Sequence, residues 1–146
     1  MAMRITVALL IAMLCVCFPV RADEPLAVII STSNPLDKLS LADLKLIYQR
    51  KSQIDAEGNR WIPLNLTVND PLRRSFSLSL FSMLPEEQDD YWNIQYFNGI
   101  SPPKVLASEE AILRFVASTT GAIGYIRQQK ADSRVKVLLM MVPAVK

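Results

Sequence analysis

The stretch LAVIIS, residues Leu26–Ser31, is an unbroken run of mostly apolar, partly β-branched side chains. A strand with one face in water alternates polar and apolar residues, whereas a strand covered on both faces does not. The run therefore predicts a strand buried inside a sheet, with other elements packed on both sides.

Helix and strand patterns alternate along the rest of the chain. The stretch SLAD at Ser40 resembles a capping box with Asp in place of the usual Glu, which predicts the start of a helix. Further helices are expected from Pro71 to about residue 84, from Pro85 to Phe97, and over residues 109–117. Strands are expected over residues 61–66, 121–126 and 135–142, with a loop over 51–60 and a linker over 100–107. Buried strands mixed with helices in one short chain predict an α/β fold.

The first 22 residues have the pattern of a secretory signal peptide. A positive N-terminus precedes an apolar run of about 13 residues, and the tripeptide VRA precedes the expected cleavage site before Asp23. A membrane anchor is the less favoured alternative, because roughly 20 apolar residues are needed to span a bilayer. We expect a periplasmic protein that is not membrane-embedded after cleavage, with one domain over residues 23–146.

Removal of this segment would take away both cysteines and two arginines, Arg4 and Arg21. The 16 basic residues would fall by two and equal the 14 acidic ones. The expected domain therefore has no disulfide, no thiol chemistry and no net charge. Because nucleic-acid binding depends on a basic surface, we expect no nucleic-acid partner.

The residue types argue against an enzyme. The sequence has no histidine, and the expected domain has no cysteine, so the commonest general base, the usual zinc ligands and the thiol nucleophile are missing. The acidic residues between Glu86 and Asp90 lack the spacing of a calcium loop, and the helix dipole accounts for them at a helix start. We expect no catalytic residue, no metal and no cofactor.

The stretch NLTVNDPLRRSF, residues 65–76, places the end of a strand directly before a helix. Free backbone N–H groups at such a junction bind anions, but Asp70 is itself a favourable N-cap residue. The candidate ligand-binding residues are Thr67, Asn69, Asp70 and Arg73. Arg73 could equally belong to a solvated helix face. Either the carboxylate of Asp70 takes the place of an anion, or it accepts hydrogen bonds from a neutral or cationic ligand.

Aromatic residues gather at Trp61 and between Tyr91 and Phe97. They could form a stacking platform, but Tyr91, Trp92, Tyr96 and Phe97 recur at helical spacing, which favours packing in the core. The expected core includes Val28, Ile30, Leu44, Ile47, Trp92, Phe115, Ile123 and Leu138.

Two glycines, Gly121 and Gly124, bracket the beginning of the strand expected over residues 121–126. Gly121 follows the helix expected over residues 109–117. It is therefore expected at a tight turn with a positive φ angle, which glycine adopts at little steric cost.

Three stretches resemble the phosphate-binding PstS-type proteins, the substrate-binding proteins of phosphate ABC transporters. LAVIISTSNPLDKLSLADLKLIYQRK is similar to a strand and Asn-Pro followed by a helix that ends in aromatic-x-Gly-Lys, and IPLNLTVNDPLRRSF is similar to the next strand and its Ser-Gly-Thr turn. The most specific likeness is EEAILRFVASTTGAIGYI, which is similar to a late helix and a Gly-Ala-Ile-Gly-Tyr strand. The resemblance spans about residues 26–142. It implies a single lobe of a type 2 periplasmic-binding-protein fold, with a central mixed sheet flanked by helices.

The same resemblance implies an altered ligand site. The family's Ser, Gly and Thr fall on Asp70, Pro71 and Leu72, its arginine falls on Leu66, and Arg50 stands where aromatic-x-Gly-Lys has glycine. The implied function is that of a periplasmic solute-binding-like protein with a degenerate anion site, binding phosphate or another small solute weakly. A membrane transporter or sensor protein would be its partner. The alternative is a partner-binding or sensor-accessory module with no small-molecule ligand.

Overall fold

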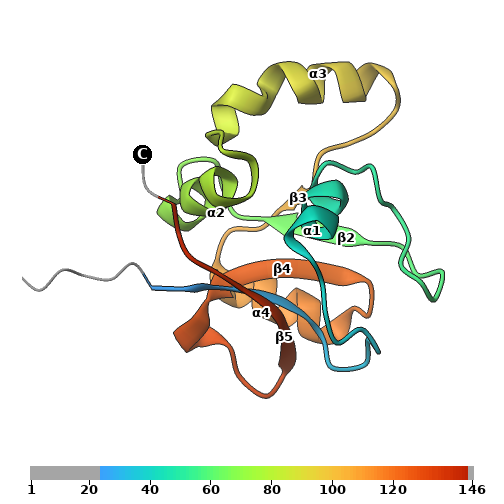
Figure 1. Ribbon diagram of the computed structural model, residues 1–146, viewed down its shortest axis with the longest axis vertical. Helices are drawn as coiled ribbons and strands as arrows, with labels where there is room; N and C mark the ends of the chain where they lie inside the picture. Colours follow the sequence, from blue (N-terminus) through green and yellow to red (C-terminus); the bar gives the residue numbers. More distant parts are fainter. Residues whose placement is uncertain (1–23, 145–146) are drawn as a thin grey trace, which may run out of the picture.

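The computed structural model of the protein describes residues 24–144 (Figure 1). The expected signal peptide and its cleavage site lie outside the described residues. The elements follow one another in this order: β1 (Leu26–Ser31), α1 (Leu41–Tyr48), β2 (Ile62–Asn65), α2 (Pro71–Phe81), the 3-10 helix η1 (Pro85–Gln88), α3 (Asp89–Phe97), β3 (Lys104–Val105), α4 (Glu109–Ser118), β4 (Ala122–Arg127), the 3-10 helix η2 (Gln128–Lys130) and β5 (Val135–Met141).

The strands form one five-stranded sheet in the order β3-β2-β4-β1-β5. β2 runs parallel to β3 and β4, whereas β1 runs antiparallel to β4 and β5. β1 lies inside the sheet with every residue buried, as the LAVIIS stretch predicts. The expected α/β fold with a central mixed sheet is confirmed.

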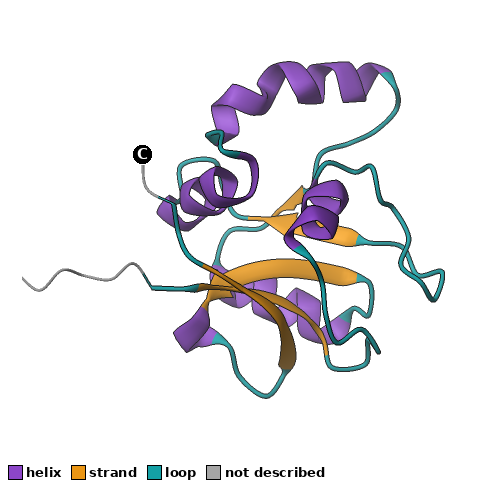
Figure 2. Cartoon of the chain, in the orientation of Figure 1, coloured by secondary structure: helices purple, strands orange, loops and turns teal. Residues whose placement is uncertain are grey.

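Helices cover both faces of this sheet (Figure 2). Neighbouring side chains of a strand point to opposite faces, and β4 makes the arrangement clear. Tyr125 stacks on Phe76 of α2, with ring centroids 3.7 Å apart, and Tyr48 of α1 packs against the same Phe76 ring. Gly124, one position earlier, faces Ile112 of α4. α1 and α2 therefore lie on one face, and α4 lies on the other.

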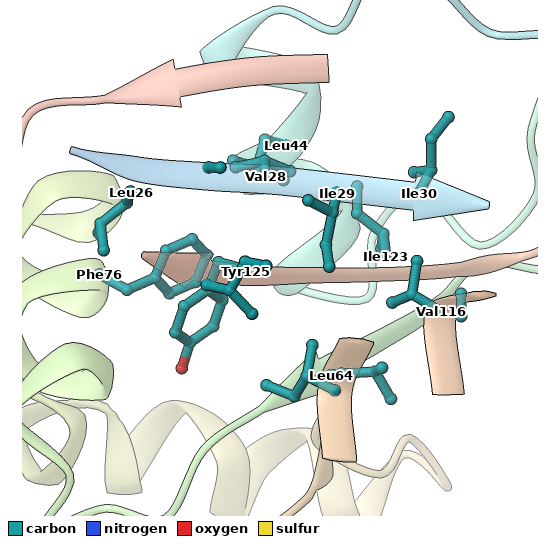
Figure 3. Packing of buried hydrophobic residues seen from close by; sticks show 14 of the residues in the cluster. Leu26, Val28, Ile29, Ile30, Leu44, Leu64, Phe76, Val116, Ile123 and Tyr125 are labelled. Carbon is teal, nitrogen blue, oxygen red and sulfur yellow. The ribbon is translucent and has the colours of Figure 1, made fainter. Parts of the chain in front are cut away.

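The hydrophobic core fills the space between these layers (Figure 3). Of the expected core residues, Phe115, Leu138 and Trp92 are only partly buried. Leu138 belongs to β5, an edge strand that pairs only with β1. The remaining expected core residues are buried as predicted: Val28, Ile30, Leu44, Ile47 and Ile123.

The helix α3 departs most from the sequence-based expectation. None of its residues is buried, and Tyr96 and Phe97 are 73% and 88% exposed. The prediction that these side chains pack in the core was wrong. Helical spacing sets which residues share a face, but it does not set whether another element covers that face. Figure 1 shows α3 at the top of the molecule, away from the sheet.

Gly121 lies in the expected turn, which a hydrogen bond from the Ala122 N–H to the Thr119 carbonyl closes at 3.0 Å. The expected positive φ angle was wrong. The structure gives a different reason for glycine. A Cβ atom at this position would lie well inside van der Waals contact with the carbonyl oxygen of Arg60. The neighbouring Ile62 N–H donates to the Gly121 carbonyl at 2.9 Å, so the two backbones lie side by side.

The linker expected over residues 100–107 contains β3, which the sequence analysis missed. This strand is two residues long and pairs Lys104 with Leu64 of β2. Pro102 and Pro103 come directly before this strand. Because proline has no backbone N–H to donate, the two residues hide the strand pattern in the sequence. The helix expected to reach residue 84 ends at Phe81, where Ser82 adopts a left-handed backbone with φ 57°. Within residues 24–144, no helix has the length and apolar character to cross a membrane.

Candidate ligand site at the start of helix α2

The connection between β2 and α2 is a short turn closed by a hydrogen bond from the Asp70 N–H to the Thr67 carbonyl, 3.0 Å long. Asp70 is the N-cap residue of α2, and Pro71 is its first helical residue. The Asp70 Oδ1 atom accepts a hydrogen bond from the Leu72 N–H at 2.8 Å, which confirms the expected cap. A carboxylate of the chain itself therefore occupies the positive end of the helix.

A shallow pocket of about 280 Å³ opens beside this cap. Its ionisable side chains are the carboxylates of Glu24 and Asp70 and the guanidinium of Arg127. The other lining residues are Pro71, Leu72, Ser75 and Pro143. With two acidic groups to one basic group, the lining offers little net attraction to an anion.

Arg127 is itself neutralised by Glu109, the first residue of α4. Its Nη2 atom donates to Glu109 Oε2 at 2.6 Å, and Lys130 Nζ donates to the same oxygen at 2.7 Å. Glu109 is 7% exposed. Burial would raise the pKa of Glu109, but hydrogen bonds from Arg127 and Lys130 outweigh it and lower the pKa to about 2. The helix α4 therefore also begins with a carboxylate, and this carboxylate is paired with two cations.

The four sequence-derived candidates do not converge on one point. Thr67 and Asn69 are exposed in the turn, and neither lines the pocket that Asp70 lines. Arg73 instead lines a very small internal cavity together with Tyr48 and residues of η1 and α3. Its Nη1 atom is buried without a hydrogen-bond partner.

A buried polar network fixes the end of β2 beneath the turn. The Tyr125 hydroxyl donates to Asn65 Oδ1 and accepts from the Leu66 N–H, both at 3.2 Å. The Tyr48 hydroxyl donates to the Leu64 carbonyl at 2.9 Å. Burial raises the pKa of both tyrosines, so the hydroxyls stay protonated and act as donors. The network positions the strand and leaves its hydroxyls inside the protein.

The sequence did not indicate that Glu24, Glu109 or Arg127 belong to this region. One local feature of the sequence places Glu109 at a helix start, because it directly follows Ser108, the N-cap residue of α4. Its meeting with Arg127 depends on how α4 packs on β4, which local sequence does not encode. Within the described part of the chain, no group of three or more metal-ligating side chains could hold a metal ion.

No protein-family model and no curated protein matches the sequence. Solved structures do match. The phosphate transport receptor of the ABC type from Vibrio cholerae superposes with a TM-score of 0.63 at 18% identity, over 79% of this chain and 45% of that one. PstS from Borrelia burgdorferi superposes with a TM-score of 0.63 at 14% identity, over 79% of this chain and 46% of that chain. A Clostridium perfringens protein superposes with a TM-score of 0.64 at 22% identity, over 79% of this chain and 44% of that chain. That protein is assigned as a phosphate ABC transporter substrate-binding protein and holds bound phosphate.

The fold is therefore that of a periplasmic-binding-protein lobe. In particular, it is similar to one lobe of phosphate ABC transporter substrate-binding proteins, as the sequence resemblance implies. The chain spans less than half the length of these proteins.

Proposed function

We propose that this protein is a periplasmic, solute-binding-like lobe whose anion site at the start of α2 is degenerate. The observation that carries the proposal is the hydrogen bond from the Leu72 N–H to the Asp70 carboxylate. The backbone donor that could hold an anion is already satisfied from within the chain. The lobe keeps the architecture of its structural relatives, and phosphate binds this position weakly.

Electrostatics supports this proposal. Two unit charges 4 Å apart repel by about 4 kcal/mol at an effective dielectric constant of 20. A phosphate in the pocket would meet Asp70 and Glu24, while the guanidinium among the lining residues, that of Arg127, already pairs with Glu109. Removing Asp70 alone would not create a phosphate site, because Leu72 supplies no hydroxyl donor.

The test is a phosphate titration of ¹⁵N-labelled protein followed by amide resonances. The amides of residues 69–73 should not shift below millimolar phosphate in the wild type. Asp70→Ser, which keeps a capping oxygen but removes the charge, should bind phosphate only in the millimolar range or more weakly. Saturation of these amides at micromolar phosphate in the wild type would overturn the proposal.

A second candidate function is that of a partner-binding or sensor-accessory module. The observation that favours it is the surface of α3, where Ile94, Tyr96 and Phe97 are 60%, 73% and 88% exposed. The Tyr96 and Phe97 rings lie next to each other with centroids 6.2 Å apart, and contiguous exposed apolar patches mark interaction surfaces when they are large. The partner would be a transporter or sensor protein of the inner membrane.

A capture experiment separates this candidate from a purely solute-binding role. Tagged wild-type protein and the double variant Tyr96→Ser, Phe97→Ser would be incubated with a solubilised envelope fraction. One membrane protein retained by the wild type and lost by the variant supports the candidate. Identical retention by both proteins contradicts it.

A further inference from the structure

A second pocket lies at the opposite end of the parallel strands, where β2 and β3 begin. Its volume is about 330 Å³, which is within the range of small-molecule sites. Three cationic side chains, those of Arg50, Arg60 and Lys104, line it, and no carboxylate does. The other lining residues are Trp61, Ile62, Pro63, Ser101, Pro102 and Pro103.

The three cations have no acidic partner among residues 24–144. None of the salt bridges in this part of the chain involves them. Asp55, in the loop that leads to Arg60, is held by Asn59, whose backbone N–H donates to it at 2.8 Å. Lys104 instead lies over the Phe115 ring, 5.3 Å from its centroid.

Arg50 carries an unsatisfied donor. Its Nη1 atom donates to the Trp61 carbonyl at 3.2 Å, but its Nε atom is buried and has no hydrogen-bond partner. Burial, and secondly the charge of Arg60, lower the pKa of Arg50. The fold therefore holds two guanidinium groups near each other without an acidic partner. A bound anion would neutralise their charge and accept their hydrogen bonds.

The backbone of Arg50 is also strained. Its φ angle is 62°, in the left-handed region, directly after the C-cap residue of α1. Glycine adopts this conformation freely, whereas a residue with a Cβ does not. The conformation belongs to the C-terminal cap of α1, in which the Arg50 and Lys51 N–H groups donate to the Ile47 and Leu46 carbonyls. Replacing Arg50 with glycine, the usual residue at this position of a cap, should therefore preserve the fold.

We propose that this pocket, formed by Arg50, Arg60 and Lys104, binds a small oxyanion: a phosphate, a sulfate or the carboxylate of an organic acid. Arg50 and Arg60 each provide a guanidinium group to the anion, and Lys104 adds positive charge. Planar guanidinium groups match the paired oxygens of carboxylate and phosphate. Trp61, which is 5% exposed, forms an apolar wall. This site lies at the other end of β2 from Asp70, so it goes beyond the proposed function and does not depend on it.

The experiment uses Trp61 as the reporter. The protein has two tryptophans, so Trp92→Phe leaves Trp61 alone to report. Fluorescence would be followed during titration with sodium phosphate, sodium sulfate and sodium succinate, and with sodium chloride at matched ionic strength. At least one oxyanion should give a saturable change with a Kd below about 1 mM, and chloride should not. The oxyanion that binds most tightly identifies the ligand class.

Three variants decide whether these residues form the site. Arg50→Gly relieves the backbone strain, so it should fold at least as well as the parent in thermal unfolding and still weaken binding tenfold or more. Arg60→Gln should weaken binding by a similar factor. Lys51→Gln removes the same charge from an exposed neighbour that does not line the pocket, and it should leave the affinity within twofold. Equal effects of all three variants, or a response that chloride reproduces, would overturn the proposal. Asp70→Ser should not change this titration, so its outcome is independent of the α2 site.

Discussion

At the residue scale, the Asp70 carboxylate accepts a hydrogen bond from the Leu72 N–H, 2.8 Å long, that caps α2. Replacing Asp70 with alanine should lower the free energy of unfolding by about 0.5–2 kcal/mol, because the first turn of α2 loses its side-chain acceptor. Asp70→Ser should be nearly neutral, because serine caps equally well. Urea denaturation of the three proteins checks this, and equal losses for both variants would show that the cap is not what Asp70 provides.

Gly121 illustrates a residue whose identity is set by its neighbour. Gly121→Ala should destabilise the protein by about 1–3 kcal/mol, since the new Cβ must push the Arg60 backbone away. Gly58→Asn is the matched control. Gly58 has a φ angle of 83° and open space around it, and asparagine tolerates that conformation. The control should stay within about 0.5 kcal/mol of wild type in the same denaturation experiment. A neutral Gly121→Ala would contradict the close approach.

At the element scale, α2 and α3 carry aromatic residues with opposite roles. Phe76 of α2 is 1% exposed and stacks on Tyr125 at 3.7 Å, so Phe76→Ala should cost about 3–5 kcal/mol of stability. Phe97 of α3 is 88% exposed, so Phe97→Ala should change stability by less than about 0.5 kcal/mol. Thermal or urea unfolding distinguishes the two. A loss above 1 kcal/mol for Phe97→Ala would mean that the Phe97 side chain packs against the body of the protein.

The first residue of α4 ties that helix to β4 through an ion pair that depends on pH. The folded-state pKa of Glu109, about 2, lies below its ordinary value of 4.5. The stabilisation is therefore fully present above pH 4.5 and is lost as the pH falls towards 2. The difference in unfolding free energy between wild type and Glu109→Gln should shrink over this range, as followed by urea denaturation at several pH values. A difference that does not change between pH 6 and pH 3 would contradict this assignment.

At the scale of the whole molecule, the described chain forms one lobe with helices on both faces of a mixed sheet. This chain covers less than half the length of its structural relatives, and the Clostridium perfringens protein holds phosphate. The two pockets described above lie at opposite ends of β2, so the lobe presents a carboxylate-rich end and a cation-rich end.

Export is a prediction at the same scale, made from the sequence of the first 22 residues. Expression of the full gene product in a Gram-negative host should yield a periplasmic protein that begins at Asp23. Intact-mass measurement of the purified protein checks the cleavage site. A product that retains Met1 in the membrane fraction would contradict the prediction.

The sequence by itself determined the elements that depend on local patterns. The apolar run LAVIIS gave a buried strand, and Asp70 followed by Pro71 gave the start of α2, because capping and strand burial are properties of neighbouring residues. The likeness of the glycine-containing stretch after α4 to a known strand indicated the fold of the lobe. Charge counting and residue types, in turn, bounded the chemistry that the protein could perform.

Tertiary structure decided which surfaces are covered and which distant residues meet. The aromatic spacing of α3 resembles that of a core helix, yet Tyr96 and Phe97 are exposed because nothing in the described chain packs over them. Glu109 meets Arg127 only because α4 lies on β4. One pocket brings together Arg50 after α1, Arg60 before β2 and Lys104 in β3. Local sequence sets the propensity of each segment, whereas packing of the layers sets the contacts between segments, and both candidate sites are made of such contacts.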